Sequence, residues 1–253
     1  MKLKILLLSF LAVFLMAGSA FALGMNITIY DNRGYSGLAA GGEDNETEPD
    51  MINAQDWDLE GFFLEGTTLT MVGGWDFLNG KSYGDKQYNS GDIFIDIDGD
   101  AKYGDGADSS YLNYGYDYVL QVNWSDSNYN VFGLSSNSIL VPVQESYNDP
   151  KSNPWRYGGG DDVLDGWNNV DFSAFGTLTD DETDFAGGTH NYVAFDLTFL
   201  GSDINNFIAH FTMGCGNDNL MGSSSVPEPS TMLLFGTGFL GLAMIGRKKL
   251  FKK

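Results

Sequence analysis

The chain has 253 residues and carries 34 acidic against 13 basic side chains, a formal net charge of −21. Such a charge repels the phosphates of nucleic acids and anionic lipid surfaces, so it argues against DNA, RNA or a membrane surface as a binding partner. Hydrophobic residues make up 43% of the chain and aromatic residues 14%, which is too much for a disordered acidic segment and enough for a folded core.

The first 22 residues have the pattern of a secretory signal peptide. Two lysines precede a short apolar run at 5–16, and Ala20 and Ala22 fit the small-x-small rule for cleavage. Cleavage after Ala22 predicts Leu23 as the first mature residue. A signal-anchor helix is the alternative, but the apolar run is too short to span a bilayer.

Residues 23–222 are predicted to form one acidic domain. Residues 23–225 hold six basic and 33 acidic residues, a formal net charge of −27, and 26 of these acids are Asp. Self-repulsion of this size destabilises a compact state unless cations offset it. Asp is favoured in turns and where short carboxylates meet a hard cation, so both explanations are open.

Alternating apolar and polar residues predict an antiparallel β-sandwich, with jelly-roll and immunoglobulin-like topologies both open. The six clearest strands are Met25 to Tyr30, Thr67 to Val72, Asp92 to Asp98, Tyr116 to Trp124, Asn191 to Phe199 and Asn206 to Thr212. Weaker candidates lie at 57–64 and 130–134. In the strand at 191–199, the alternation predicts one face in the core and one face in water. Two glycine-rich or proline-rich stretches, 34–54 and 145–165, are predicted to be long loops that could meet ligands.

The strongest chemical signal in this domain is a run of aspartates. Alternation places Ile93 and Ile95 in the core and a row of carboxylates on the opposite face. Clustered carboxylates repel one another, and Ca²⁺ prefers six to eight oxygen ligands. The pattern predicts a calcium site, although a solvated Asp-Gly turn is an equal alternative. An EF-hand is excluded because the glycine is Gly99 instead of the sixth residue of the loop, and the twelfth residue is Ala107 instead of glutamate. The predicted ligands are Asp92, Asp96, Asp98, Asp100, Asp105 and Asp108, and Asp117 on the following strand could approach them.

Aromatic residues in the second long loop suggest carbohydrate binding. Trp155 and Tyr157 flank Arg156 and could offer flat faces to sugar rings; the alternative is that they fill or cover the core. No catalytic motif accompanies them. His190 is expected on a loop and His210 as a structural residue in a strand, so the chain is not predicted to be an enzyme, with a polysaccharide hydrolase as the remote alternative.

The C-terminus has three parts that read as a sorting and anchoring segment. Pro227, Glu228 and Pro229 lie in a predicted linker at 223–230. An apolar run and a terminal cluster of five basic residues follow, and they predict a transmembrane helix with a cytoplasmic tail at 231–253.

This tripartite tail resembles the PEP-CTERM sorting signal of Gram-negative bacteria. The resemblance implies processing by an exosortase-type membrane protease. It also implies export through the inner membrane to the cell surface or extracellular matrix, often alongside exopolysaccharide. It covers about a tenth of the chain and leaves the activity open.

Three segments of the body are also similar to stretches of exported PEP-CTERM surface proteins. These are Gly91 to Asp100, Tyr114 to Leu120 and His210 to Asp218. The resemblance implies a shared scaffold in which His210, Cys215, Asn217 and Asp218 have structural roles. The lone Cys215 excludes an intrachain disulfide and is expected to be buried, with an intermolecular disulfide or a lipid attachment as alternatives. The expected role is therefore a structural or interaction role at the cell surface or in the extracellular matrix, with a lectin-like module for exopolysaccharide as the alternative.

Overall fold

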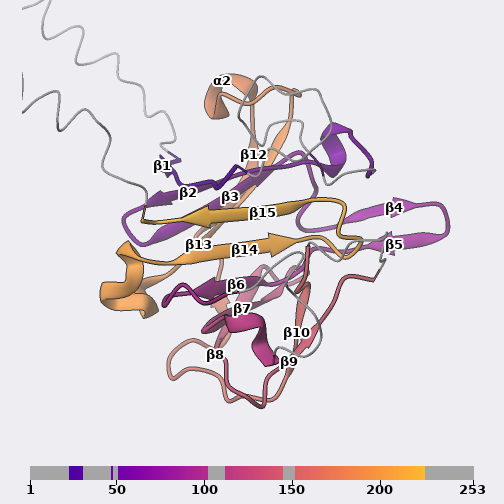
Figure 1. The fold of residues 1–253 in the computed structure, drawn as a ribbon. Coiled ribbons are helices and arrows are strands. Elements are labelled where there is room, and N and C mark those ends of the chain that lie inside the picture. The colour runs from indigo at the N-terminus through magenta and orange to yellow at the C-terminus, as the bar shows by residue number, and fades with distance from the viewer. Residues whose placement is uncertain (1–22, 31–46, 48–50, 102–111, 145–151, 226–253) are drawn as a thin grey trace, which may run out of the picture.

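The computed structural model describes residues 23–30, 47, 51–101, 112–144 and 152–225. Two antiparallel sheets pack against each other in it (Figure 1). The five-stranded sheet has the order β1 (Met25–Asn26), β2 (Leu59–Glu65), β3 (Thr68–Gly73), β13 (His190–Asp196), β12 (Ala174–Leu178). The six-stranded sheet has the order β11 (Val170–Asp171), β8 (Asn128–Gly133), β7 (Tyr118–Asn123), β6 (Ile93–Asp96), β14 (Ile208–Thr212), β15 (Asn219–Ser223).

Alternate residues of both sheets meet in one apolar core. The five-stranded sheet contributes Phe62, Met71 and Phe195, and the six-stranded sheet contributes Ile95 and Phe211; all five are fully buried. Removing such side chains from water stabilises the folded state by roughly 25 cal/mol per Å² of buried apolar surface. This burial is the main force that holds the two sheets together. The mostly β, antiparallel class predicted from the alternation is confirmed, while the jelly-roll and immunoglobulin-like topologies stay predictions.

The outer faces of both sheets carry smaller hydrophobic clusters. On the six-stranded sheet, Phe94, Val119 and Tyr157 pack with two further tyrosines. On the five-stranded sheet, Tyr192 packs against a cluster around Val72, and its neighbour Ala194 is 2% exposed. The fully wet outer face expected for this strand is therefore wrong, because residues outside the strand cover part of it.

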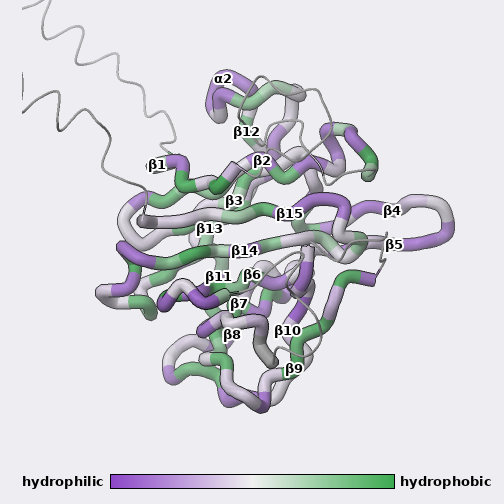
Figure 2. Tube along the Cα trace, in the orientation of Figure 1, coloured by the Kyte–Doolittle hydropathy of each residue, from purple (hydrophilic) through white to green (hydrophobic). Residues whose placement is uncertain are grey.

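Four short helices and two hairpins complete the described fold. The 3-10 helices are Gln55–Trp57, Leu112–Gly115 and Thr198–Asn205, and the α-helix is α2 (Asp180–Thr183). The hairpin of β4 (Lys81–Tyr83) and β5 (Lys86–Tyr88) is largely exposed and hydrophilic, whereas β14 carries a hydrophobic stretch (Figure 2). The second hairpin pairs β9 (Ile139–Val141) with β10 (Arg156–Gly159). The predicted loop at 145–165 is thus corrected in part, since β10 lies within it.

One edge of the molecule is closed by the first described segment. The N–H of Ile27 donates to the carbonyl of Phe62 beside β2 (2.9 Å), and the carbonyl of Ile27 accepts the N–H of Ser223 at the end of β15 (2.7 Å). Thr28 faces Gly222 in an antiparallel bridge. A single short segment therefore joins the two sheets, and β15 ends one residue later than the predicted domain boundary at 222.

Candidate functional site

Three of the carboxylates at one end of the six-stranded sheet gather as the sequence suggests. Asp96 ends β6, Asp98 follows in the turn, and Asp117 precedes β7; one oxygen of each lies within 4.8 Å of the others. We call Asp96, Asp98 and Asp117 the acidic cluster. Its residues belong to neighbouring antiparallel strands, so the pairing of β6 with β7 brings the carboxylates together.

Backbone N–H groups hold the acidic cluster in place. Asp96 is buried, and its two oxygens accept from Asp98, Gly99 and Ala101 at 2.7–3.1 Å. Asp117 accepts from the N–H of Ile97 at 2.8 Å. Each carboxylate oxygen has two lone pairs, so an oxygen that accepts one N–H can still face a cation.

The electrostatics of the acidic cluster favour a bound proton or cation. Desolvation raises the pKa of Asp117 above its ordinary value, the N–H of Ile97 opposes this shift, and the negative charges of Asp98, Asp96 and Asp100 add to it. Oxygen-only donors of this kind suit Ca²⁺, which accepts carboxylates at variable geometry. Asp96, Asp98 and Asp117 are therefore the residues that could hold the ion. Asp117 was predicted to approach the six predicted ligands from the strand that follows the aspartate run, and the structure places it in the cluster.

Asp92 does not belong to the acidic cluster, which corrects its predicted role. Its side chain is fully buried, and its oxygens accept from the N–H of Val122 (2.9 Å) and of Tyr157 (2.7 Å). The Nε of Arg156 lies 3.8 Å from Oδ1. Burial raises the pKa of Asp92 to about 6, against the opposing charge of Arg156 and the two N–H groups. Asp92 ties β10 to the six-stranded sheet and offers no ligand to a cation at the other end of β6.

Of the three remaining predicted ligands, Asp100 is described by the structure, and Asp105 and Asp108 are not. Asp100 lies in the turn after β6, and its N–H donates to Oδ1 of Asp98 (3.2 Å).

The structure buries the two aromatic residues predicted to bind sugar. Trp155 is 7% exposed and Tyr157 is 5% exposed. The hydroxyl of Tyr157 donates to Oδ2 of Asp161 (3.0 Å) and accepts the N–H of Asp161 (2.8 Å). Flat ring faces must be open to stack on a sugar, so these two side chains provide no platform in this conformation. They cover the sheet, as the alternative interpretation expected.

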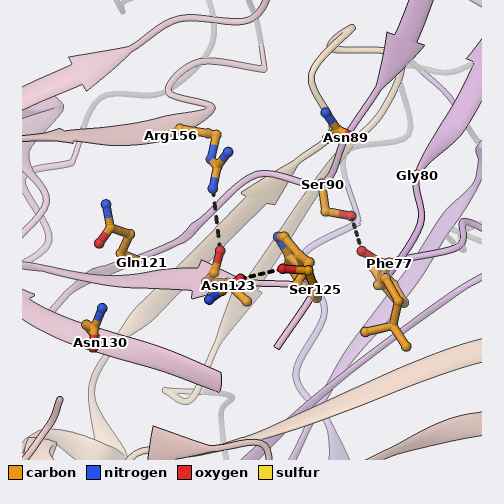
Figure 3. A pocket seen from close by; sticks show the side chains of 12 residues that line it. Phe77, Gly80, Asn89, Ser90, Gln121, Asn123, Ser125, Asn130 and Arg156 are labelled. Carbon is orange, nitrogen blue, oxygen red and sulfur yellow. Dashed lines mark hydrogen bonds between the residues drawn. The ribbon is translucent and has the colours of Figure 1, made fainter. Parts of the chain in front are cut away.

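A polar pocket of about 420 Å³ lies beside Arg156 (Figure 3). Its walls come from the ends of β7 and β8, from the segment before β4, and from the residues after β5. The residues that line it are Phe77, Leu78, Gly80, Asn89, Ser90, Gln121, Val122, Asn123, Trp124, Ser125, Asn130 and Arg156. None of the predicted site residues lies in this pocket, although their neighbour Arg156 does, and the alternating amides in 121–123 and 128–130 were a signal that could have indicated it.

Both histidines are buried. His190 begins β13 instead of lying on a loop, and its Nδ1 lies 2.7 Å from an oxygen of Glu60, while Nε2 lies 3.0 Å from Oδ1 of Asp180. The hydrogen bond between His190 and Asp180 lowers the pKa of Asp180 more than any other contact does. His210 stacks on Tyr116, with ring centroids 5.7 Å apart, and burial lowers its pKa to about 3.

The turn between β14 and β15 has a structural role. Cys215 is buried and forms no disulfide, which confirms the expected burial. Asn217 exchanges hydrogen bonds with the backbone of Ile52, and Oδ2 of Asp218 accepts the N–H of Leu59 at 2.6 Å. These bonds fix the start of β2 against the opposite sheet.

The sorting residues Pro227, Glu228 and Pro229 lie outside the described residues, as do the signal-cleavage residues Ala20 and Ala22. No helix within the described ranges is long and apolar enough to cross a bilayer. Residues 225–249 match the PEP-CTERM protein-sorting motif. No curated protein and no solved structure gives a match to this chain. The motif implies export, sorting to the cell surface of a Gram-negative bacterium, and processing by an exosortase.

Proposed function

We propose that this chain is a non-enzymatic surface or extracellular-matrix protein whose acidic cluster binds calcium once the chain has left the cytoplasm. The sorting motif at 225–249 is the observation that supports the proposed export, sorting and processing of the chain. Two hydrophobic outer clusters and the burial of both histidines support a structural role, because neither imidazole is open to a substrate.

The proposed export and processing are tested in the native host by changing Glu228 to Ala. In the wild-type strain, mass spectrometry of the mature protein should show loss of the residues after the motif. The variant should keep residues 231–253 and stay in the membrane fraction, because the protease no longer recognises its substrate. An unprocessed wild-type chain recovered from the cytosol contradicts the proposal.

Calcium would stabilise the folded state through the acidic cluster. Bound ligand adds about 2.7 kcal/mol at a hundredfold excess over Kd. For an extracellular-type Kd of about 10⁻⁴ M, 10 mM calcium provides that excess. The same free energy corresponds to a rise in Tm of about 5–10 °C for a domain of this size.

The calcium test compares the full-length chain in a detergent with two variants. The wild type should gain thermal stability in calcium and lose it in EGTA. Asp117→Asn should abolish most of the gain, because it removes one charge from the cluster. Asp85→Asn removes an exposed carboxylate at the tip of the β4–β5 hairpin and should keep the full response. Identical melting curves of the wild type in calcium and in EGTA would refute calcium binding by the acidic cluster. They would not bear on the proposed export and processing.

A further inference from the structure

The pocket at the ends of β7 and β8 has a chemistry that the acidic cluster does not share. Apolar residues cover one half of the outer face of these strands, where Val119 and Phe132 pack under the β9–β10 hairpin. The next outward positions are Gln121 on β7 and Asn130 on β8. The pocket therefore opens where the hydrophobic cover of the sheet stops.

The strand register places the amides of this pocket side by side. Gln121 pairs directly with Asn130, and Asn123 pairs with Asn128 in the next position along the same two strands. Directly opposed residues in an antiparallel pair have Cβ atoms roughly 5 Å apart. Of these four amides, those of Gln121, Asn123 and Asn130 line the pocket, and the pairing of β7 with β8 holds their backbones in place.

Several of these amides have hydrogen-bonding capacity left. Oδ1 of Asn130 accepts the N–H of Asn169 (2.7 Å), which fixes the orientation of this amide. Asn123 is held through both of its amide atoms, by Asp126 (2.7 Å) and by the hydroxyl of Ser125 (2.9 Å). Gln121 lines the pocket, and its side chain makes no hydrogen bond to any described residue, so its donor and its acceptor remain available to a ligand.

The charge of the pocket separates it from the rest of the exported domain. Among the described residues that line it there is no Asp and no Glu, and Arg156 is the one cation. Figure 3 shows Arg156, Gln121 and Asn130 around the same space. The guanidinium of Arg156 already faces the buried Asp92 and donates to the carbonyl of Val122 (3.4 Å), so its charge is partly offset. An uncharged polar ligand fits this environment better than an anion, since the net charge of the domain repels anions.

We propose that this pocket binds a neutral oligosaccharide. An amide offers a donor and an acceptor at adjacent atoms, and a sugar hydroxyl needs the same pair. Phe77 and Trp124 are buried and stack on each other in the pocket wall, so hydrogen bonds to the amides, and not stacking on a ring, would hold the sugar. The volume of about 420 Å³ lies within the range of roughly 300–1,000 Å³ that small-ligand sites occupy.

The saccharide site is independent of the acidic cluster. β7 begins beside Asp117 and ends at Asn123, so the two sites lie at opposite ends of the strand, roughly 20 Å apart. Binding of the sugar should therefore persist in EGTA. This separates a failure of the saccharide site from a failure of the calcium site.

The test is calorimetric titration of the full-length chain in a detergent without a sugar headgroup. The probes are cellotetraose, maltotetraose and mannotetraose, with a tetrasaccharide of mannuronate as the acidic counterpart, each in EGTA. We expect at least one neutral probe to bind and the acidic probe to bind at least about tenfold more weakly. Gln121→Ala should weaken the neutral probe by about fivefold to tenfold, because one hydrogen-bonding amide is lost.

Two further variants keep the result interpretable. Asn205→Ala removes an exposed amide from the 3-10 helix Thr198–Asn205 and should leave affinity unchanged. Gln121→Glu keeps the size of the side chain and should also weaken binding while preserving the melting temperature. The proposal is overturned if no neutral probe binds at 10 mM, if the acidic probe binds as tightly, or if both Gln121 variants bind like the wild type.

Discussion

Asp92 predicts an unusual pH dependence of stability. Its carboxylate is fully buried between β6, β7 and β10, and burial raises its pKa from 3.8 to about 6. A folded-state pKa above the unfolded value means that the folded protein binds this proton more tightly. Stability is therefore gained as the pH falls through about 6 and is lost as the pH rises from about 4 to above 6. A shift of about two pKa units corresponds to about 3 kcal/mol.

The variant Asp92→Asn isolates this effect, because it cannot titrate. The amide keeps one acceptor for the N–H groups of Val122 and Tyr157 but leaves the other without one, which costs roughly 1–3 kcal/mol at every pH. The wild type should be the more stable of the two near pH 4. Its advantage should shrink by about 3 kcal/mol, and can reverse, as the pH rises to 8.

The assay is urea unfolding of the full-length chain, followed by tryptophan fluorescence from pH 4 to 8. Asp85→Asn corrects for the loss of one exposed negative charge from the chain. The quantity of interest is the difference in unfolding free energy between the wild type and Asp92→Asn at each pH. If that difference stays constant within about 0.5 kcal/mol, Asp92 is not the buried, proton-binding group that the geometry requires, and the reasoning fails.

Three further predictions concern packing, and each is measured by the same unfolding assay. Phe195→Ala removes a fully buried ring that contacts Tyr129 and Phe172, and should lower the free energy of unfolding by about 3–5 kcal/mol. Phe175 lies on the adjacent strand and is 49% exposed, so Phe175→Ala should lower it by less than about 1 kcal/mol. His190→Ala leaves the buried Glu60 without its imidazole partner and should cost about 3–5 kcal/mol; a loss below about 1 contradicts a structural role for this contact. Gly74→Ala should cost about 1–3 kcal/mol because its Cβ would lie 1.8 Å from the carbonyl oxygen of Gln55, and Gly133→Ala, with 3.6 Å to its nearest neighbour, is the control expected to have little effect.

Local sequence pattern predicted the strands well where they lie in the main core. The segments at 67–72, 116–124 and 206–212 correspond to β3, β7 and β14 within a few residues. Their apolar residues alternate because one face of each strand meets the opposite sheet. The short strands β9 and β10 were missed. β9 has only three residues, β10 ends in two glycines that are typical of a loop, and tertiary contacts set the pairing of both.

The candidate site could be predicted only in part, for a related reason. The run from Asp92 to Asp100 correctly marked a turn with clustered carboxylates, but sequence alternation could not show that β10 covers Asp92 and leaves Asp98 open. Burial of Trp155 depends on the same long-range packing. The amide pairing of Gln121 with Asn130 depends on strand register, which a single sequence does not specify.

The bridge between Thr28 and Gly222 has a consequence for how the chain is tethered during export. Because the pairing is antiparallel, the chain traced backward from Thr28 and forward from Gly222 leaves in one common direction. The predicted signal peptide and C-terminal anchor would then emerge at the same corner of the domain. A domain that is attached to one bilayer at both ends could therefore form the pairing of residues 27–28 with 222–223 before either end is cleaved. Folding and proteolytic release then need not occur in a fixed order.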